Sequence, residues 1–207
     1  LKDIVKDTEQ ATFIIYTYDE YGSPCGIGSG FFIDKEGIGI TNYHVLDGAV
    51  KAILKTSDEK KYEIDQVIAS NRKLDIAKFT IRNKNNEKFP YLKFANKEIE
   101  KGDKVYNISN PMGLEASISE GIVSSLRSDG PHGNIVQTTA PISPGSSGSA
   151  LLNEEGEVFA IATFKYNRGE NLNFGVLLDE KKLELLDDND FAKRNGKDSP
   201  SHDTLQL

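Results

Sequence analysis

Short apolar runs separated by turn-forming residues recur along most of the chain. Runs of about four to eight residues that are rich in Val, Ile, Phe and Tyr, and are bounded by Gly, Pro, Asn or Asp, are typical of strands rather than helices. The pattern predicts strands at Thr12–Tyr18, Ile27–Ile33, Ile38–Thr41, Ala49–Lys55, Lys61–Ala69, Asp75–Ile81, Lys104–Ile108, Ala116–Val123, Asn134–Thr139, Ser149–Asn153, Glu157–Phe164 and Leu172–Leu178.

Helical patterns occur only at the two ends of this region, at Lys2–Gln10 and Glu180–Leu186. The chain is therefore predicted to be all-β. The polar stretch Asn83–Lys88 divides the predicted strands into two halves, and no repeat of fixed period relates them. From about Asp187 onward the sequence turns polar, and we expect residues 191–207 to form a mobile tail or a linker.

The net charge limits the choice of partners. The 207 residues include 25 Lys and Arg against 32 Asp and Glu, a net charge of −7, with no dense basic block. Nucleic acid and anionic membranes are therefore disfavoured as main partners. The sequence has no apolar stretch of about 18 residues that would span a bilayer. Its single cysteine, Cys25, cannot form an internal disulfide, so the fold is expected to depend on packing alone.

The segment 141–150, Pro-Ile-Ser-Pro-Gly-Ser-Ser-Gly-Ser-Ala, concentrates small and turn-forming residues directly before a predicted strand. A flexible linker would have a similar composition, but a linker seldom leads straight into a strand. The alternative is a tight turn that presents one hydroxyl group. A serine hydroxyl is a poor nucleophile at neutral pH, so this reading requires an imidazole to take its proton and an acid to orient the imidazole.

Of the three histidines, His44 is the best candidate for that imidazole. His132 occupies a turn-like Gly-Pro-His-Gly segment and His202 lies in the polar tail, so both are interpreted as exposed polar residues. His44 lies near the end of the strand-like run Gly39–Leu46, where it is either a buried structural histidine or a catalytic base. Asp75 opens the apolar run Asp75–Phe79, where it is either a turn residue or the acid that orients the imidazole.

Three blocks carry a family resemblance: Thr41–Val45, Asp75–Ala77 and Pro144–Leu151. They resemble the signature segments of chymotrypsin-fold, trypsin-like serine proteases, most closely those of the HtrA/Deg branch. The resemblance covers roughly Gly26 to Leu178. It extends to the segments between the blocks, at Gly28–Ile33, Asn110–Leu114, Gly121–Ser124 and Gln137–Thr138.

The resemblance implies two six-stranded antiparallel β-barrels with short terminal helices, within a protease domain at residues 1–190. The first barrel is expected at about 12–82 and the second at about 100–178. His44 and Asp75 would come from the first barrel and Ser147 from the second, and the three would form a catalytic triad in the cleft between them. The backbone N–H groups of Gly145 and Ser147 would form the oxyanion hole.

No metal or cofactor is expected, because one Cys and three dispersed His provide no ligand cluster. Ser146 is the alternative nucleophile. The family pattern of glycine, any residue, serine, glycine favours Ser147, because Gly148 follows it.

The resemblance also suggests where the S1 pocket lies. In this fold its floor and wall come from the segment before the nucleophile and from a later strand, which match Ile142 and the run Ala162, Thr163 and Phe164. No aspartate occupies the pocket floor, so a trypsin-like preference for Lys or Arg is disfavoured and a small or medium aliphatic P1 residue is expected. Ser149 instead resembles glutamyl endopeptidases, which prefer acidic residues. That branch places a histidine on the pocket strand, where this chain offers only the nearby Lys165.

The expected partners are polypeptide substrates, including unfolded or misfolded proteins. No PDZ domain is expected in the chain after Leu178. The aromatic residues Phe13, Tyr16, Tyr18 and Tyr21 are either trimer contacts of the HtrA type or, as we favour, ordinary strand residues.

Family resemblance favours an extracytoplasmic or secreted bacterial protein and leaves the cytoplasm open. A trypsin-like N-terminal activation sequence is missing, so we expect regulation through the loops Asn110–Leu114 and Ser124–Gly133. A protease-fold module that binds peptides without cutting them is the competing hypothesis. A cutting or sensing arm tethered to a larger protein is a third.

Overall fold

The computed structural model describes residue 6 and residues 8–109, 117–128, 134–163, 173–184 and 186. The helix predicted at Lys2–Gln10 falls largely outside these residues, and the tail predicted at residues 191–207 falls wholly outside them. The elements within the described residues are β1 (Thr12–Tyr18), β2 (Pro24–Phe32), β3 (Gly39–Thr41), α2 (Tyr43–Leu46), β4 (Lys51–Thr56), β5 (Lys61–Asn71), β6 (Ile76–Ile81), β7 (Lys104–Ser109), β8 (Ser117–Ser128), β9 (Asn134–Thr138), β10 (Ala150–Leu152), β11 (Val158–Thr163), β12 (Asn173–Leu177) and α3 (Glu180–Glu184).

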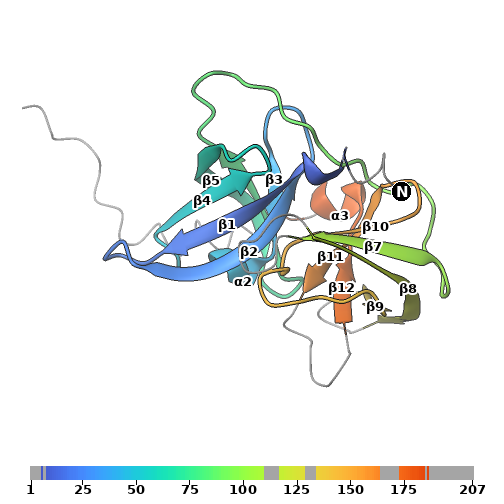
Figure 1. Ribbon diagram of the computed structural model, residues 1–207. Helices are drawn as coiled ribbons and strands as arrows, with labels where there is room; N and C mark the ends of the chain where they lie inside the picture. The colour runs from blue at the N-terminus through green and yellow to red at the C-terminus, as the bar shows by residue number, and fades with distance from the viewer. Residues whose placement is uncertain are drawn as a thin grey trace, which may run out of the picture.

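These strands form two closed barrels of six strands each (Figure 1). The strand order is β1-β2-β3-β6-β5-β4 in the first, barrel one, and β10-β11-β12-β9-β8-β7 in the second, barrel two. The pairings within both barrels are antiparallel. The prediction of an all-β double barrel is therefore confirmed. The limits of the domain at residues 1–190 remain a prediction.

Two strands differ most from their predicted bounds. β2 begins at Pro24, because a bulge between Thr17 and Tyr18 lets Tyr18 pair with that proline across the hairpin. β8 runs on to Ser128 because its first half pairs with β7 and its second half with β9. Local sequence pattern does not reveal such a change of partner, so the prediction ended the strand at Val123.

Barrel one has an aromatic core. Phe13 packs against Phe32 with ring centroids 4.6 Å apart, and Phe32 against Phe89 at 4.7 Å. Phe79 and Tyr62 complete the cluster, at 6.0 Å from Phe13 and 5.1 Å from Phe89. Each buried aromatic ring contributes about 1.5–3 kcal/mol from the apolar surface that it removes from water.

Barrel two has an interior of smaller aliphatic side chains, which include Val105, Val123, Val136 and Leu151. A third apolar cluster takes residues from both barrels and joins them. Its members include Phe31, Ile40 and Ile76 from barrel one and Tyr106, Ile108 and Ile161 from barrel two. The two barrels therefore share a continuous hydrophobic contact, which fixes one against the other.

The structure corrects the reading of Gly39–Leu46 as one strand-like run. β3 ends at Thr41, and Tyr43–Leu46 forms the single helical turn α2. Tyr43, Val45 and Leu46 are buried, whereas His44 is exposed. The apolar residues that suggested a strand therefore form the buried face of a helical turn. His44 lies on the opposite, exposed face of the same turn.

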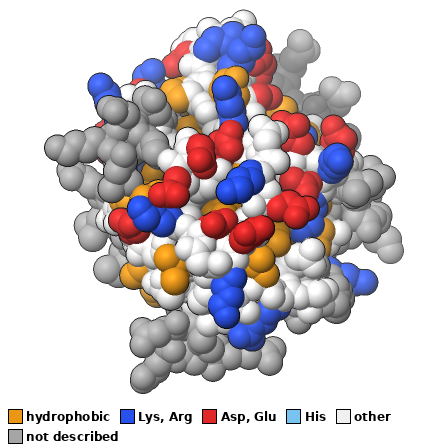
Figure 2. Space-filling model, turned by 90° about the vertical axis from the view of Figure 1, so that its right-hand side faces the viewer, with side chains coloured by type: hydrophobic (Ala, Val, Ile, Leu, Met, Phe, Trp, Pro, Cys, Tyr) orange, Lys and Arg blue, Asp and Glu red, His pale blue; other side chains and the backbone are white. Residues whose placement is uncertain are grey.

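Acidic and basic side chains are mixed over the face of the molecule shown in Figure 2, in keeping with the moderate net charge. On barrel two, Lys104 forms an ion pair with Glu154 at 3.3 Å. Among the residues that the structure describes, neither helix has the length and apolar character needed to cross a lipid bilayer.

Candidate active site

Asp75 is a buried carboxylate that is fully supplied with hydrogen-bond donors. The residue is 0% exposed and lies directly before β6. Its Oδ1 accepts the backbone N–H of His44 at 3.0 Å, and its Oδ2 lies 2.8 Å from Nδ1 of His44. The Thr163 hydroxyl donates to the same Oδ2 at 3.2 Å. Burying a carboxylate is costly in free energy unless such bonds replace its hydration. The contacts from His44 and Thr163 therefore offset the cost of burying Asp75.

The backbone of Asp75 is held in an unusual conformation. Its φ of 57° is left-handed, a region that non-glycine residues rarely occupy and that Asp tolerates better than most. Its carbonyl oxygen accepts the side-chain amide of Asn42 at 2.9 Å and the backbone N–H of Tyr43 at 3.1 Å. The segment that carries His44 therefore also fixes the backbone of the acid. The prediction that Asp75 opens a strand is corrected by one residue, because β6 begins at Ile76.

His44 presents its imidazole to solvent from α2. Its side chain is 38% exposed, whereas its partner Asp75 is completely buried. When Nδ1–H donates to the carboxylate, Nε2 is left with a free lone pair that can accept a proton. The arrangement is therefore that of an oriented general base.

The segment before β10 forms a tight turn, the nucleophile turn, defined here as Ser143–Ser149. Gly145 and Gly148 each have a φ of 91°, which a residue with a Cβ adopts only under strain. Within the turn, Ser146 N donates to Ser143 O and Ser149 N to Ser146 O, each at 2.9 Å. These residues thus form a defined turn, and the linker interpretation of 141–150 is wrong.

Ser146 and Ser147 have different surroundings. Ser146 is 1% exposed, and its hydroxyl bonds to the hydroxyl of Ser109 on β7 at 3.0 Å. Ser147 is 6% exposed, and its carbonyl oxygen accepts the backbone N–H of Ser29 at 2.8 Å. The hydroxyl of Ser146 therefore belongs to a buried contact inside barrel two.

The nucleophile turn packs against the part of barrel one that carries His44. A Cβ placed on Gly28 would lie 2.6 Å from Cγ1 of Val45, the neighbour of His44, and 3.3 Å from the carbonyl oxygen of Ser147. A Cβ on Gly148 would overlap the carbonyl oxygen of Ser29 and the hydroxyl of Thr41. The structure therefore brings together the three segments that contain His44, Asp75 and Ser147.

The residues predicted to line the S1 pocket have other contacts in the structure. Ile142 is 7% exposed and belongs to the apolar interior of barrel two, together with Ala162. The backbone of Ala162 pairs with the turn: its carbonyl accepts Gly148 N at 3.0 Å and its N–H donates to Ser149 O at 2.8 Å. Thr163 directs its hydroxyl at Asp75. Phe164 lies outside the described residues, as does Lys165.

Ser149, the residue that departs from the HtrA pattern, supports the segment before the turn. Its hydroxyl donates to Oδ1 of Asn107 at 2.7 Å, and the amide of Asn107 donates to the Pro141 carbonyl at 3.3 Å. Ser119 donates to the same carbonyl at 2.8 Å. A hydroxyl at position 149 therefore has a structural partner in this chain.

Sequence reasoning placed Asn42 and Ser29 inside family-like segments but gave them no role, and it assigned Thr163 only to the S1 pocket. Their partners lie far along the chain: Thr163 is 88 residues from Asp75, and Ser29 is 116 residues from Gly145. The local signal was that each is a polar residue within or next to a run of apolar residues and glycines. That signal identifies a buried polar group but does not identify its partner.

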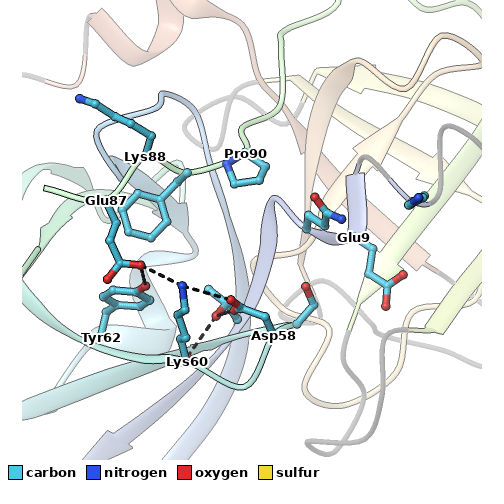
Figure 3. A pocket seen from close by; sticks show the side chains of 12 residues that line it. Glu9, Asp58, Lys60, Tyr62, Glu87, Lys88 and Pro90 are labelled. Atoms are coloured by element: carbon cyan, nitrogen blue, oxygen red, sulfur yellow. Dashed lines mark hydrogen bonds and ion pairs between the residues drawn. The ribbon is translucent and has the colours of Figure 1, made fainter. Parts of the chain in front are cut away.

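A cavity of about 500 Å³ lies elsewhere on the molecule, beside the β4–β5 turn (Figure 3). Lys60 bonds there to Glu87 at 2.9 Å and to Asp58 at 3.4 Å, and the Tyr62 hydroxyl donates to Glu87 at 3.0 Å. Burial and the Glu87 carboxylate raise the pKa of Tyr62 to about 12. The cavity is lined by none of His44, Asp75 or Ser147. We therefore do not assign the candidate chemistry to it.

Among the described residues, no group of three or more His, Cys, Asp or Glu side chains is arranged to hold a metal ion. The candidate site consists of the imidazole, the carboxylate and the serine turn.

Comparison with known proteins agrees with this geometry. Residues 28–161, more than half of the chain, match the family model of the trypsin-like peptidase domain. The chain is 33% identical over 159 residues to "Protease Do-like 1, chloroplastic" of Arabidopsis thaliana. It is 34% identical over 141 residues to "Probable periplasmic serine endoprotease DegP-like" of Chlamydia trachomatis. These alignments cover 73% and 66% of this chain, and 36% and 28% of the relatives, so the chain spans about a third of the length of the curated relatives that it matches.

Among solved structures, the serine endoprotease from Yersinia pestis is similar, with a TM-score of 0.75 and 27% sequence identity. The match covers 88% of this chain and 63% of that one. The chain therefore belongs to the trypsin-like peptidase domain family, and within it the proteins that it resembles include serine endoproteases of the Do and DegP-like type.

Proposed function

We propose that this chain cleaves peptide bonds through a triad of His44, Asp75 and Ser147. The observation that carries the proposal is the 2.8 Å contact between Nδ1 of His44 and the fully buried Oδ2 of Asp75, beside a serine turn tied to the same barrel. A buried carboxylate that orients a half-exposed imidazole is the arrangement that serine activation requires.

In the proposed mechanism, Nε2 of His44 takes the proton of the Ser147 hydroxyl as its oxygen attacks the carbonyl carbon of the scissile peptide. The Asp75 carboxylate stabilises the imidazolium that results. His44 then donates the proton to the leaving amine, which departs and leaves Ser147 as an acyl ester. A water molecule, activated by His44, hydrolyses the ester and restores the hydroxyl.

The backbone N–H groups of Gly145 and Ser147 are the proposed donors to the negatively charged oxygen of the tetrahedral intermediate. Gly145 supports this assignment because its left-handed backbone, with a φ of 91°, forms part of the turn two residues before the proposed nucleophile. One such donor contributes about 2.7–4 kcal/mol to the transition state in serine hydrolases.

The contacts of the two adjacent serines support Ser147 over Ser146 as the nucleophile. The Ser146 hydroxyl already has a buried partner, Ser109, at 3.0 Å. To attack a substrate, the Ser146 oxygen would have to leave that buried contact inside barrel two. Ser147 follows at the position where the turn meets the part of barrel one that holds the base.

For specificity we propose a small or medium aliphatic P1 residue. The proposed S1 residues that lie within the described part of the chain are Ile142, Ala162 and Thr163. Two of them have apolar side chains, and the hydroxyl of the third donates to Asp75. The alternative for this chain is an acidic P1 preference like that of glutamyl endopeptidases. It is supported by Ser149 alone, and the hydroxyl of Ser149 is bonded to Asn107.

The proposed substrates are polypeptides in unfolded or misfolded form, and the proposed location is extracytoplasmic. The proposals of polypeptide substrates and of an extracytoplasmic location follow the relatives, since the Chlamydia trachomatis protein is named a periplasmic serine endoprotease. The unfolded or misfolded form of the substrate follows the family resemblance of the sequence. Since this chain spans only part of those relatives, control by further domains and assembly into a trimer are not carried over.

A fluorophosphonate probe tests the triad directly. The wild type is expected to be labelled at Ser147, and Ser147→Ala is expected to lose labelling. The loss in peptide cleavage should be roughly 10⁶-fold, as in other serine hydrolases that lose their nucleophile. Ser146→Ala serves as the matched control, because it removes the neighbouring hydroxyl and should keep labelling.

Absence of labelling in the wild type would favour a peptide-binding module that does not cut. A digest of a peptide library then distinguishes aliphatic from acidic P1 preference, since the cleavage sites report the P1 residue.

A further inference from the structure

Ser29 of barrel one makes contacts with the nucleophile turn that the proposed mechanism does not use. The residue is 1% exposed, and its hydroxyl donates to the carbonyl oxygen of Gly145 at 2.8 Å. Its backbone N–H donates to the carbonyl oxygen of Ser147, also at 2.8 Å. One residue of barrel one therefore bonds to the turn of barrel two on both sides of Ser146.

The hydroxyl bond fixes the peptide group that lies between the two proposed oxyanion donors. Gly145 has no Cβ, so its backbone can rotate at little steric cost unless something else holds it. The N–H of the Gly145–Ser146 peptide donates to Ser143 O at 2.9 Å, and its carbonyl accepts the Ser29 hydroxyl. Both polar atoms of this peptide are thus bonded, one from within the turn and the other from the opposite barrel.

Ser29 is in turn held from the side that carries the base. The Thr41 hydroxyl donates to the Ser29 carbonyl oxygen at 2.7 Å, and Thr41 is the last residue of β3, directly before the segment that leads into α2. Two consecutive hydrogen bonds, through Ser29, therefore join Thr41 at the end of β3 to the carbonyl of Gly145. Placement of the oxyanion side of the site thus depends on barrel one.

We propose that Ser29 is a positioning residue for the oxyanion hole. Its hydroxyl holds the Gly145–Ser146 peptide in the orientation that keeps the N–H groups of Gly145 and Ser147 directed at one point. This inference rests on the proposed function. Ser29 does not touch substrate, so its loss should slow the bond-forming step and leave the affinity of the first complex unchanged, because the oxyanion develops only in the transition state.

The test separates binding from reaction with a fluorophosphonate, whose phosphoryl oxygen occupies the oxyanion hole after attack. Wild type, Ser29→Ala, Ser29→Cys and Ser124→Ala are compared. Ser124 is the matched control, because its hydroxyl donates to the Gln137 carbonyl at 3.0 Å, the same kind of bond inside barrel two and between β8 and β9. The maximal labelling rate, the half-saturating probe concentration and the urea midpoint are measured for each.

We expect Ser29→Ala to lower the maximal labelling rate by roughly 10–100-fold, the cost of a misplaced reacting geometry, at an unchanged half-saturating concentration. Ser29→Cys should give an intermediate rate, since a thiol of similar size is a weaker donor. Ser124→Ala should label at the wild-type rate, with a fall in urea midpoint similar to that of Ser29→Ala.

If the wild type is labelled at Ser147 and Ser29→Ala has the same maximal labelling rate as the wild type, this inference is overturned and the proposed function stands. No labelling of the wild type would overturn both. If Ser29→Ala does not fold, the comparison of Ser29→Cys with the wild type carries the same test.

Discussion

The base and the nucleophile of the proposed site are held in different ways in the two barrels. His44 is oriented by a charged group, since the buried Asp75 carboxylate accepts its backbone N–H and contacts its Nδ1. Ser147 is placed by a backbone turn, which depends on two left-handed glycines and on neutral hydrogen bonds from Ser29. Removing the charge of Asp75 should therefore disturb the orientation of His44. Adding side-chain volume to the glycines of the turn should disturb the placement of Ser147.

The interiors of the barrels differ in a parallel way. Barrel one packs large aromatic rings such as Phe13, Phe32 and Phe79, whereas barrel two packs smaller aliphatic side chains. Gly39 makes room for the rings, because a Cβ there would lie 2.5 Å from Phe79. The aromatic core makes barrel one closely packed, and both Asp75 and His44 are carried by this barrel.

Among the changes that test this comparison of the two barrels, the largest effect is expected from removing the charge of Asp75 while keeping its shape. Asp75→Asn preserves size, but its amide favours the wrong imidazole tautomer, so the labelling rate or kcat should fall by about 10⁴-fold. Asp65→Asn is the matched control, because Asp65 pairs with Arg82 at 3.0 Å on the surface of the same barrel and should have no effect on rate. Wild-type activity in Asp75→Asn would show that charge does not orient His44.

A smaller but still large effect is expected from adding volume to the nucleophile turn. Gly148→Ala combines backbone strain at a φ of 91° with overlap against Ser29 and Thr41, and should cost about 3 kcal/mol or more in the free energy of unfolding.

The control for that variant is Gly102→Ala. Gly102 has a φ of 98° with nothing within 4 Å of its would-be Cβ, so it reports the strain alone, about 1–2 kcal/mol. Urea unfolding of both variants measures the difference. Equal losses would mean that the contact between the turn and barrel one is not tight.

The smallest effect is expected from a charge network of barrel one that lies away from the proposed site. Tyr62 donates to Glu87, and its pKa is raised to about 12 from an ordinary 10.0. Because the folded state disfavours the phenolate, this stabilisation is fully present below about pH 10 and is lost as pH rises toward 12.

Tyr62→Phe should therefore be less stable than the wild type at neutral pH by about 1 kcal/mol. That difference should shrink between pH 10 and pH 12, as followed by urea unfolding. The labelling rate should not change. A difference that grows with pH would contradict the sign of the shift, and a lowered rate would connect the network to the site.

Most of the strand pattern followed from local sequence, because alternation and turn residues act over a few positions. β1 at Thr12–Tyr18 is an example, since its bounds agree with the prediction. The helical turn α2 was missed because the buried residues of a single turn also fit a short strand. β8 was predicted too short because its change of partner from β7 to β9 is a tertiary event.

The sequence by itself determined the all-β class and the division near Asn83–Lys88, since residue types and spacing carry that information; its resemblance to the family's signature segments gave His44, Asp75 and Ser147 as candidates. Only the tertiary structure decided that Asn42 and Thr163 support Asp75, that Ser146 bonds to Ser109 and that Ser29 reaches Gly145. A hydrogen bond needs its donor and acceptor within about 3 Å, and for partners dozens of residues apart that separation is set by how two barrels close and pack.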